Sequence, residues 1–211
     1  MARGFVCAVT ISAIQRAPNV EHFYQDIFGF FWFEEGYRRM LQTLPLDRPS
    51  VFVEIGSYQG KSTAFLGVEI LNRGLPVTLH CVDSWETPNG QANGLAIHDA
   101  FERNTTGIAA ALEERFVVHW SPSVAAAEDF PEASADVVWV DGDHSYEGVT
   151  ADILAWWPKV KPGGWMGGDD FMMFPVAKAV CEQFAPNYIL CHGWTTKPEP
   201  MPWPSWLVRK G

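Results

Sequence analysis

The chain has 211 residues, of which 47% are hydrophobic and 19% charged, enough apolar material for one domain with its own core. A net charge of −10 argues against nucleic acid as a partner, because binding phosphate groups requires a basic face. The four scattered cysteines form no C-x-x-C pair, and no apolar run reaches the roughly 18 residues of a membrane span. We therefore expect a cytoplasmic protein that contacts no membrane.

Residues 1–48 are expected to form a helical segment ahead of the sheet. Residues 3–14 resemble a signal peptide only faintly, and a strand or helix packed on the domain is the preferred interpretation. Residues 19–44 begin with a candidate Asn cap, carry aromatic and aliphatic side chains at helical spacing, and end before Pro45, which predicts one helix. Two roles remain open for it: packing on the sheet, or covering the substrate site as a lid.

Residues 49–211 alternate between short apolar runs and helical patterns. The pattern predicts helices at 61–71, 96–112, 123–130, 146–157 and 176–184, and strands at 51–55, 77–82, 116–120, 135–140, 165–168, 188–191 and 206–209. Strands that alternate with helices indicate a parallel sheet covered on both faces. The last two strands have little helix between them, which predicts an antiparallel hairpin at one edge. Residues 88–94 are expected to form a loop, and the Pro-rich residues 198–204 a connector.

A glycine turn joins the first strand to the next helix. Gly56 and Gly60 would let a ligand approach the backbone, and the helix that follows offers free N–H groups. The nicotinamide fingerprint G-x-G-x-x-G has a glycine where Tyr58 stands here. Glu54 would also repel a pyrophosphate and favour a cation. The turn therefore predicts a cofactor that is not a nicotinamide dinucleotide, with a purely structural turn as the alternative.

Polar and aromatic residues end the second and third strands. Asp83 could accept both hydroxyls of a ribose, or it could serve as a cap. Ser84 and Trp85 follow it, and Trp85 could stack on an adenine or on a substrate ring. Trp120 and Ser121 could flank the adenine, although Ser121 is equally suited to capping a helix.

Two acidic clusters follow the fourth and fifth strands. Asp141 and Asp143 belong to the first, and Asp169 and Asp170 form the second. Adjacent parallel strands lie ~4.8 Å apart, so carboxylates at their ends can meet. Hard divalent cations such as Mg²⁺ bind groups of oxygens of this kind. The sequence therefore predicts a cofactor and a metal side by side at one edge of the sheet.

These stretches resemble the class I S-adenosylmethionine-dependent methyltransferases. More narrowly, they resemble the metal-dependent small-molecule O-methyltransferase group, which includes the macrocin and mycinamicin enzymes and the cephalosporin hydroxylase-like proteins. The resemblance covers roughly residues 50–185 and is carried by VEIGSYQGKST, CVDSW, ADVVWVDGDHSYEGVTADILAWWPKVKPGG, GGDDF and VAKAV. It implies an α/β fold: a single Rossmann-like, doubly wound, mostly parallel seven-stranded sheet with an antiparallel edge hairpin and an N-terminal helical lid. One domain is expected to span residues 1–211, with 49–211 as its Rossmann-like core.

The resemblance also implies two cofactors and the residues that hold them. S-adenosylmethionine would be contacted by Glu54, Gly56, Gly60 and Asp83, and the expected set is completed by Ser57, Ser62, Ser84, Trp120, Ser121 and Asp141. Mg²⁺ would be held by Asp141, Asp169 and Asp170. Related sugar methyltransferases take a base from the loop after the fourth strand, which makes Asp143 and His144 the candidates here.

The expected function is Mg²⁺-dependent O-methylation of a small diol, catechol or sugar-like substrate. Mg²⁺ would orient two substrate oxygens and make the reacting hydroxyl easier to deprotonate. Two alternatives remain open: a cephalosporin hydroxylase-like oxidoreductase, and a non-catalytic protein that binds S-adenosylmethionine. The expected partner is a hydroxylated small molecule, with no nucleic acid and no membrane, and the chain could form a homodimer.

Overall fold

A computed structural model describes residues 19–86, 94–192 and 204–211. Three features expected from the sequence fall wholly or mostly outside these ranges, namely the structure of residues 3–14, the loop at 88–94 and the connector at 198–204. Among the described residues, no helix combines the length and the apolar character that crossing a bilayer requires.

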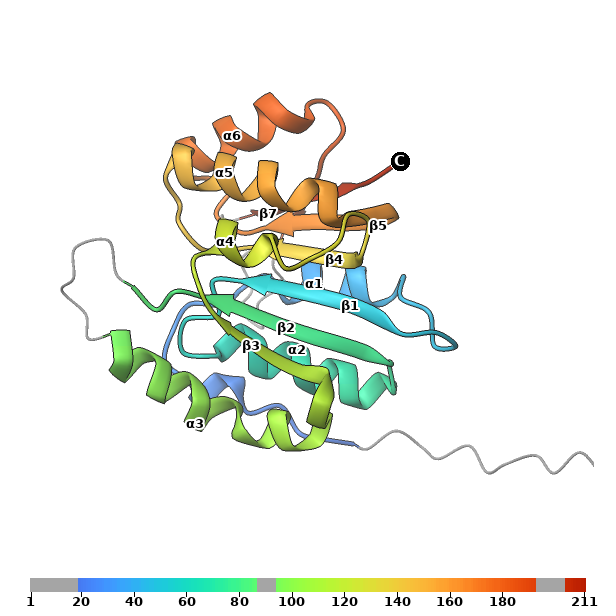
Figure 1. Ribbon diagram of the computed structural model, residues 1–211, viewed down its shortest axis with the longest axis vertical. Coiled ribbons are helices and arrows are strands. Elements are labelled where there is room, and N and C mark those ends of the chain that lie inside the picture. The colour runs from blue at the N-terminus through green and yellow to red at the C-terminus, as the bar shows by residue number, and fades with distance from the viewer. Residues whose placement is uncertain (1–18, 87–93, 193–203) are drawn as a thin grey trace, which may run out of the picture.

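Seven strands form one mixed sheet in the order β3-β2-β1-β4-β5-β7-β6 (Figure 1). The strands are β1 (Ser50–Ile55), β2 (Val77–Asp83), β3 (Phe116–Trp120), β4 (Ala135–Val140), β5 (Val160–Gly168), β6 (Ile189–His192) and β7 (Pro204–Arg209). The first five run parallel, and β7 pairs antiparallel with both β5 and β6. The predicted fold class, including the antiparallel edge hairpin, is confirmed.

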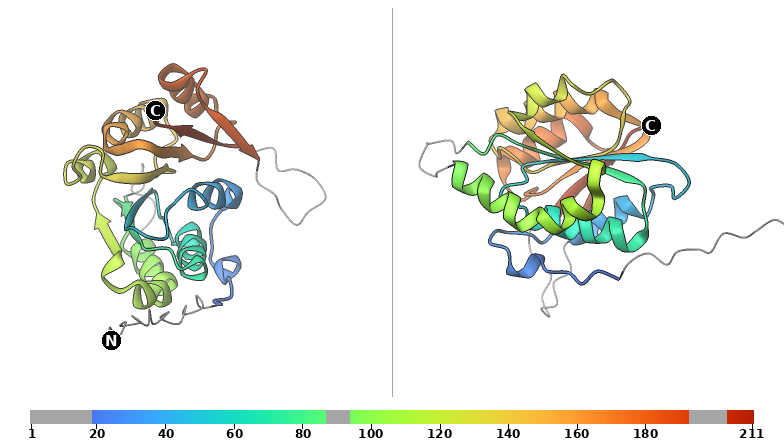
Figure 2. Two further views of the ribbon diagram at one scale, coloured as in Figure 1. Left: turned by 90° about the vertical axis from the view of Figure 1, so that its right-hand side faces the viewer. Right: turned by 60° about the horizontal axis from the view of Figure 1, so that its bottom comes forward.

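Helices cover both faces of the sheet (Figures 1 and 2). On one face lie α1 (Glu34–Leu41), α2 (Lys61–Arg73) and α3 (Gly94–Leu112). On the other lie α4 (Ser123–Ala127), α5 (Tyr146–Trp156) and α6 (Phe174–Phe184). Short 3₁₀ turns occur at Tyr24–Asp26, Glu113–Arg115 and Trp157–Lys159.

Successive side chains along each strand pack alternately into two separate cores, one on each face of the sheet. Phe52 and Trp139 point into the cluster under α1, α2 and α3, whereas Val53 and Val138 point into the cluster under α4, α5 and α6. Successive strand residues face opposite sides of the sheet, so a continuous apolar run supplies both cores at once. This explains why the buried strands appear in the sequence as unbroken apolar runs.

The N-terminal segment differs from the single helix predicted for residues 19–44. Only the 3₁₀ turn Tyr24–Asp26 and the helix α1 form, and residues 27–33 between them are not helical. Gly29 interrupts the segment with a φ of +135°, a backbone conformation that residues with a side chain rarely adopt. Beyond it the exposure alternates: Phe30 is 81% exposed, while Phe31 and Phe33 are buried. The aromatic residues follow a period of two, because bulky rings favour an extended backbone packed on a core.

The order in which strands are added to the sheet reverses between β1 and β4, which are parallel neighbours. From β1 the chain proceeds outward to β2 and β3, and then returns to β4 and β5. In open α/β sheets, ligands bind in the crevice outside the carboxyl ends of the strands at this reversal. The loops after β1, β2, β4 and β5 meet there, and they carry most of the residues singled out in the sequence.

Candidate active site

A pocket of about 830 Å³ opens at the carboxyl ends of the parallel strands. Its walls come from the loops after the five parallel strands, from the starts of α4 and α5, and from the N-terminal segment around Phe28 and Trp32. A volume of this size is typical of small-molecule and cofactor sites. The lining includes ten of the residues predicted from the sequence: Gly56, Ser57, Ser62, Asp83, Ser84, Asp141, Asp143, His144, Asp169 and Asp170.

The glycine turn after β1 lies directly against the loop after β4. Gly56 has a φ of +85°, and a Cβ on it would overlap the carbonyl oxygen of Asp141. The Asp141 backbone N–H also donates to the carbonyl of Ile55 at 2.9 Å. Glycine is therefore required at position 56 for a steric reason within the protein, and it brings the expected cofactor turn beside the acidic cluster.

Glu54 sits under this turn and does not line the pocket. It has no exposed surface, and its carboxylate accepts hydrogen bonds from the hydroxyls of Tyr37 and Ser57, both at 2.8 Å, and from that of Thr63. Burial raises the pKa of the Glu54 carboxyl, and the three hydroxyl donors oppose that rise. The placement differs from the direct cofactor contact expected for Glu54. Its carboxylate instead anchors the turn by accepting from Ser57, which does line the pocket.

Gly60, Trp120 and Ser121 also lie outside the lining. Gly60 packs against α3, where a Cβ would come within 2.7 Å of Thr105 Cγ2. Trp120 is 53% exposed and donates from Nε1 to the carbonyl of Ser84 at 2.9 Å. Ser121 donates its backbone N–H to the carbonyl of Asp83 at 3.0 Å. Each of these residues shapes a loop of the site, and none of them faces the pocket in this structure.

Asp83 ties the loop after β2 to the loop after β1. One of its oxygens accepts from the backbone N–H of Tyr58 at 2.8 Å, and the other accepts from that of Trp85 at 2.6 Å. Burial raises the pKa of the Asp83 carboxyl, whereas these backbone donors lower it. Tyr58 and Trp85 both adopt a left-handed backbone, with φ of +46° and +49°. Strain of this kind is often concentrated at ligand sites, and here two hydrogen bonds to one carboxylate hold it in place.

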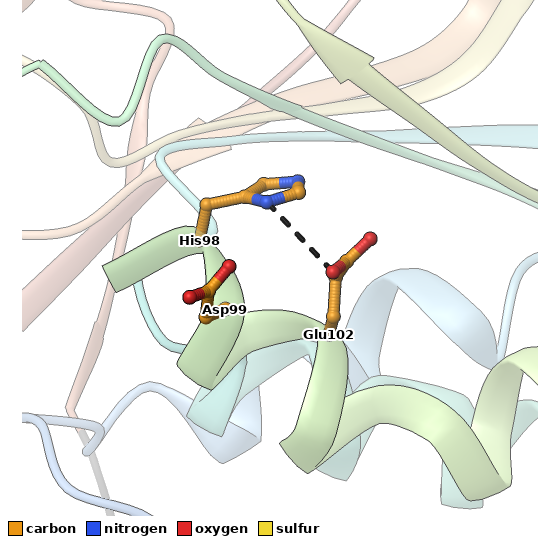
Figure 3. A group of neighbouring side chains, drawn as sticks. All are labelled: His98, Asp99 and Glu102. Carbon is orange, nitrogen blue, oxygen red and sulfur yellow. Dashed lines mark ion pairs between the residues drawn. The ribbon is translucent and has the colours of Figure 1, made fainter. Parts of the chain in front are cut away.

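Trp85 does not offer a free ring for stacking. It is 3% exposed and lies edge-on to His98 with ring centroids 4.4 Å apart. His98 in turn stacks on Trp120 at 4.1 Å. Figure 3 shows His98 with Asp99 and Glu102 on the first turns of α3, where His98 Nδ1 lies 4.0 Å from Glu102 Oε2. Because Asp99 and Glu102 are exposed and the His98 ring belongs to the aromatic cluster, we assign this group to packing at the rim.

The two acidic clusters meet at His144, and the side chains that come together as a possible metal group are Asp141, His144 and Asp170 rather than the expected Asp141, Asp169 and Asp170. His144 Nε2 lies 3.3 Å from Asp141 Oδ1 and 3.2 Å from Asp170 Oδ2, so one imidazole bridges carboxylates from two loops. Asp169 is 6% exposed, and its Oδ1 has no hydrogen-bond partner. Asp170 adopts a left-handed backbone with a φ of +57°. Atoms of Asp141, His144 and Asp170 that could bind a metal ion all lie within 4.8 Å of one another.

The carboxylates around His144 have too little positive charge near them. Burial, followed by the neighbouring carboxylates, raises the pKa values of Asp141 and Asp169 well above the ordinary range for aspartate. The hydrogen bond to Asp141 raises the pKa of His144 to about 8. Several carboxylates thus share one imidazolium, and a buried oxygen remains without a donor. A divalent cation would supply the missing positive charge, and carboxylate oxygens suit Mg²⁺, so the residues present fit this ion.

Asp143 and His144 differ in their hydrogen-bond partners within the protein. The Asp143 carboxylate accepts from the backbone N–H and the hydroxyl of Ser145, at 2.8 and 2.9 Å. Ser145 in turn caps α5 by accepting from the backbone N–H of Gly148 at 3.0 Å. Asp143 is therefore part of the helix start, whereas the ion pairs of His144 within the described part of the chain are with the acidic cluster.

Sequence reasoning did not single out four residues that the structure brings to the site. Tyr37 reaches Glu54 from α1, and no local pattern reveals a contact between residues this far apart in a fold. Phe28 and Phe30 line the pocket beside Lys61, which donates to the carbonyl of Ile27 at 2.7 Å. Aromatic residues spaced by two around Gly29 were the available signal for them. Asp152 lines the pocket from α5, and one acid within a helix gives no signal of its own.

Comparison with known proteins places this site in context. Residues 53–171, more than half of the chain, match a protein-family model described as a methyltransferase domain. The sequence matches no curated protein.

Solved structures share the fold at low sequence identity. An rRNA methylase from Streptococcus thermophilus is 13% identical, with a TM-score of 0.58, over 86% of this chain and 98% of that one. A protein from Streptococcus mutans, described as a methyltransferase and solved with SAH, is 11% identical, with a TM-score of 0.58, over 87% and 99%. The TDP-rhamnose 3'-O-methyltransferase of calicheamicin biosynthesis is 16% identical, with a TM-score of 0.54, over 84% and 77%.

The rRNA methylase corrects one expectation. Nucleic acid was excluded as a partner because the chain is acidic, and that exclusion is wrong, since an enzyme with the same fold acts on rRNA. Net charge is a sum over the whole chain, and it does not describe the surface beside one pocket. Fold alone does not identify the acceptor either.

Proposed function

The chain belongs to the class I S-adenosylmethionine-dependent methyltransferases, and from that premise we propose that it is a Mg²⁺-dependent O-methyltransferase. The proposed acceptor is a small diol, catechol or sugar-like molecule, and residues 1–211 are proposed to act as one domain. The observation that carries the proposal is that Asp141, Asp169 and Asp170 line the same pocket as the glycine turn, with Asp141 and Asp170 joined through His144. A protein that only bound S-adenosylmethionine would have no need of this acidic group.

The proposed roles divide between the two halves of the pocket. Gly56, Ser57, Ser62 and Asp83 would hold S-adenosylmethionine, with Asp83 accepting from the ribose hydroxyls. Asp141, Asp169 and Asp170 would hold Mg²⁺, which when bound would orient two neighbouring acceptor oxygens and lower the pKa of the reacting hydroxyl. Carboxylates that have too few donors within the protein are suited to this task.

His144 is the better candidate for the base. Its imidazole sits among the carboxylates that would bind the metal. A bound cation would take over those carboxylates and lower the pKa of His144, which would free Nε2 to accept the proton of a hydroxyl held there. Asp143 already has two partners at Ser145, and moving it would disturb the start of α5. We therefore assign proton removal to His144 and helix capping to Asp143.

Aromatic side chains favour an acceptor with a flat or apolar portion. Phe28, Phe30 and Trp32 line the same pocket as the acidic group. Phe28 is 71% exposed and Phe30 is 81% exposed, so their rings are available to cover a bound molecule. Covering the acceptor would also exclude water from the site.

The alternative of an iron oxygenase has no suitable ligand set among the described residues. The group at the pocket contains one histidine and aspartates, whereas the usual non-haem iron triad has two histidines and one carboxylate.

A methyl-transfer assay tests the proposal. Wild-type protein with S-adenosylmethionine and a panel of catechols and sugar diols is expected to release SAH and a monomethyl ether. EDTA should abolish the reaction, and excess Mg²⁺ should restore it. Monophenols that lack the second hydroxyl are the matched control and should react at least about 10-fold more slowly. Full turnover in EDTA, or equal rates for monophenols and diols, would contradict the metal role.

A further inference from the structure

The geometry points to Lys61 as the residue that positions the aromatic wall of the pocket, by which we mean Phe28, Phe30 and Trp32. This deepens the proposed function and rests on it, because it names a residue on which affinity for the acceptor depends. Lys61 is the first residue of α2, directly after the glycine turn. It is partly buried, and it lines the pocket together with the wall.

The chain that leads into the aromatic wall is fastened along α2, starting from the far end of the helix. Asn72 accepts from the backbone N–H of Val20 at 2.7 Å and donates to the carbonyl of the same residue at 2.9 Å. Closer to the pocket, Glu69 Oε1 lies 3.3 Å from His22 Nε2. These contacts fix the start of the segment against the helix.

Two further contacts continue the series toward the pocket. The ring of Phe65 meets that of Tyr24 edge-on, with centroids 5.3 Å apart. Lys61 ends the series, because its ammonium donates to the carbonyl of Ile27 at 2.7 Å. Positions 61, 65, 69 and 72 are spaced by three or four residues, so they share one face of the helix. The segment therefore runs antiparallel to α2 and reaches the pocket at Lys61.

Lys61 is the last of these fastenings before the aromatic wall. A Cβ on Gly29 would lie 3.8 Å from Lys61 Cδ, so the stem of the lysine lies beside the backbone of the wall. Within the described part of the chain, no backbone–backbone hydrogen bond involves Phe28, Gly29 or Phe30. The next anchor is the buried ring of Phe31. The position of the wall therefore depends on Lys61 on one side and on Phe31 on the other.

The charge of Lys61 is directed to this backbone rather than to the acidic cluster. It is the only lysine or arginine among the described residues that line the pocket. Its ammonium takes part in none of the ion pairs found between described residues. A hydrogen bond from a charged donor is stronger than one between neutral groups. The bond to the carbonyl of Ile27 is thus well suited to holding a segment that has few other restraints.

A wall held in place lowers the cost of binding the acceptor. Phe28 and Phe30 are largely exposed, and rings that are already fixed lose little freedom when a molecule packs against them. This contact acts on the ground state and the transition state alike, because it does not involve the reacting atoms. Lys61 should therefore influence KM for the acceptor far more than kcat.

Steady-state kinetics of Lys61→Met test the inference, because methionine keeps the length of the stem and removes the donor. With saturating S-adenosylmethionine and Mg²⁺, we expect KM for catechol to rise about 10-fold and kcat to stay within about threefold of wild type. Affinity for SAH should stay within about twofold. Lys61→Arg keeps a charged donor and should recover most of the loss in KM.

Limited proteolysis of the ligand-free protein tests the same contact without an acceptor. Chymotrypsin cleaves exposed aromatic sites at a rate that follows the population of the locally opened chain. Cleavage after Phe28 and Phe30, mapped by mass spectrometry, should be at least about fivefold faster in Lys61→Met. Cleavage at sites elsewhere in the same digest should keep its wild-type rate and serves as the internal reference.

Two control variants separate Lys61 from the rest of the segment. Asn72→Ala releases the far end of the segment, and Lys178→Met removes a cation from an exposed position of α6. Both should leave KM and cleavage of the wall within about twofold of wild type. Unchanged KM or unchanged cleavage in Lys61→Met, or an equal rise of KM in Asn72→Ala, would overturn the inference. A wild type that methylates no diol would refute the proposed function, while faster cleavage in Lys61→Met would still show that Lys61 holds the wall.

Discussion

The proposed cofactor side and the proposed metal side of the site are both acidic, but only on the cofactor side do groups of the protein itself satisfy the carboxylates. Glu54 and Asp83 accept hydrogen bonds from hydroxyls and backbone N–H groups of the same chain. Asp141 and Asp170 share one imidazole, and a buried oxygen of Asp169 has no partner. Donors within the chain already stabilise Glu54 and Asp83, whereas the second cluster would gain most from a cation that arrives from solution.

This difference has an energetic cause. Taking carboxylates out of water is unfavourable unless hydrogen bonds or opposite charges compensate. On the proposed cofactor side, hydrogen bonds from neighbouring loops compensate for the loss of water, and the same bonds hold those loops in place. On the proposed metal side the compensation is incomplete. Burial raises the pKa values of Asp141 and Asp169, and a bound cation would offset the cost of ionising them.

The largest expected effect separates the two members of the loop after β4. His144→Asn is expected to lower kcat about 100-fold at saturating Mg²⁺, because it removes the base, while the affinity for SAH stays within about twofold. Asp143→Asn should lower kcat far less and reduce the free energy of unfolding by about 1 kcal/mol, because Asp143 supports the start of α5. Steady-state kinetics and urea unfolding check both variants. A larger loss of kcat in Asp143→Asn, with unchanged stability, would reverse the assignment.

A second prediction tests whether Glu54 is a structural carboxylate, as the comparison of the two sides assumes. Glu54→Ala removes the acceptor of three buried hydroxyls and should lower the free energy of unfolding by about 3 kcal/mol, as measured in urea. Tyr37→Phe, which removes one donor and keeps the ring, is the milder companion and should cost about 1 kcal/mol. If Glu54→Ala were as stable as wild type but failed to bind SAH, Glu54 would be a direct cofactor ligand after all.

The smallest expected effect depends on pH. Burial raises the pKa of folded Asp152 to about 6, above an ordinary unfolded value of about 3.9, so its contribution to stability is present below pH 4 and is lost as the pH rises through 6. Without cofactor, Asp152→Asn should therefore be more stable than wild type by about 2 kcal/mol at pH 8, with the difference vanishing toward pH 4. Glu147→Gln should show no such pH dependence. A gap that widened on acidification would contradict the sign.

The sequence was sufficient for the parts of this protein that depend on local pattern. Apolar runs and glycine turns predicted the strands, the helices between them and the edge where Asp141 meets Asp170. The N-terminal helix was mispredicted because Phe31 and Phe33 satisfy a period of two as well as a helical spacing, and the backbone of Gly29 decides between them. The partners of Glu54 could not be predicted, because Tyr37 approaches it from another element. Net charge misled about nucleic acid because it carries no positional information.

Calorimetric titration of Mg²⁺ into the protein in the presence of SAH tests the central claim most directly. The account predicts one binding site in wild type, with affinity reduced at least about 100-fold in Asp169→Asn, because that change removes a carboxylate from the set. Glu147→Gln, which removes an equal charge from an exposed position of α5, should bind Mg²⁺ as wild type does. Equal Mg²⁺ binding by wild type and Asp169→Asn would show that the acidic cluster is not a metal site.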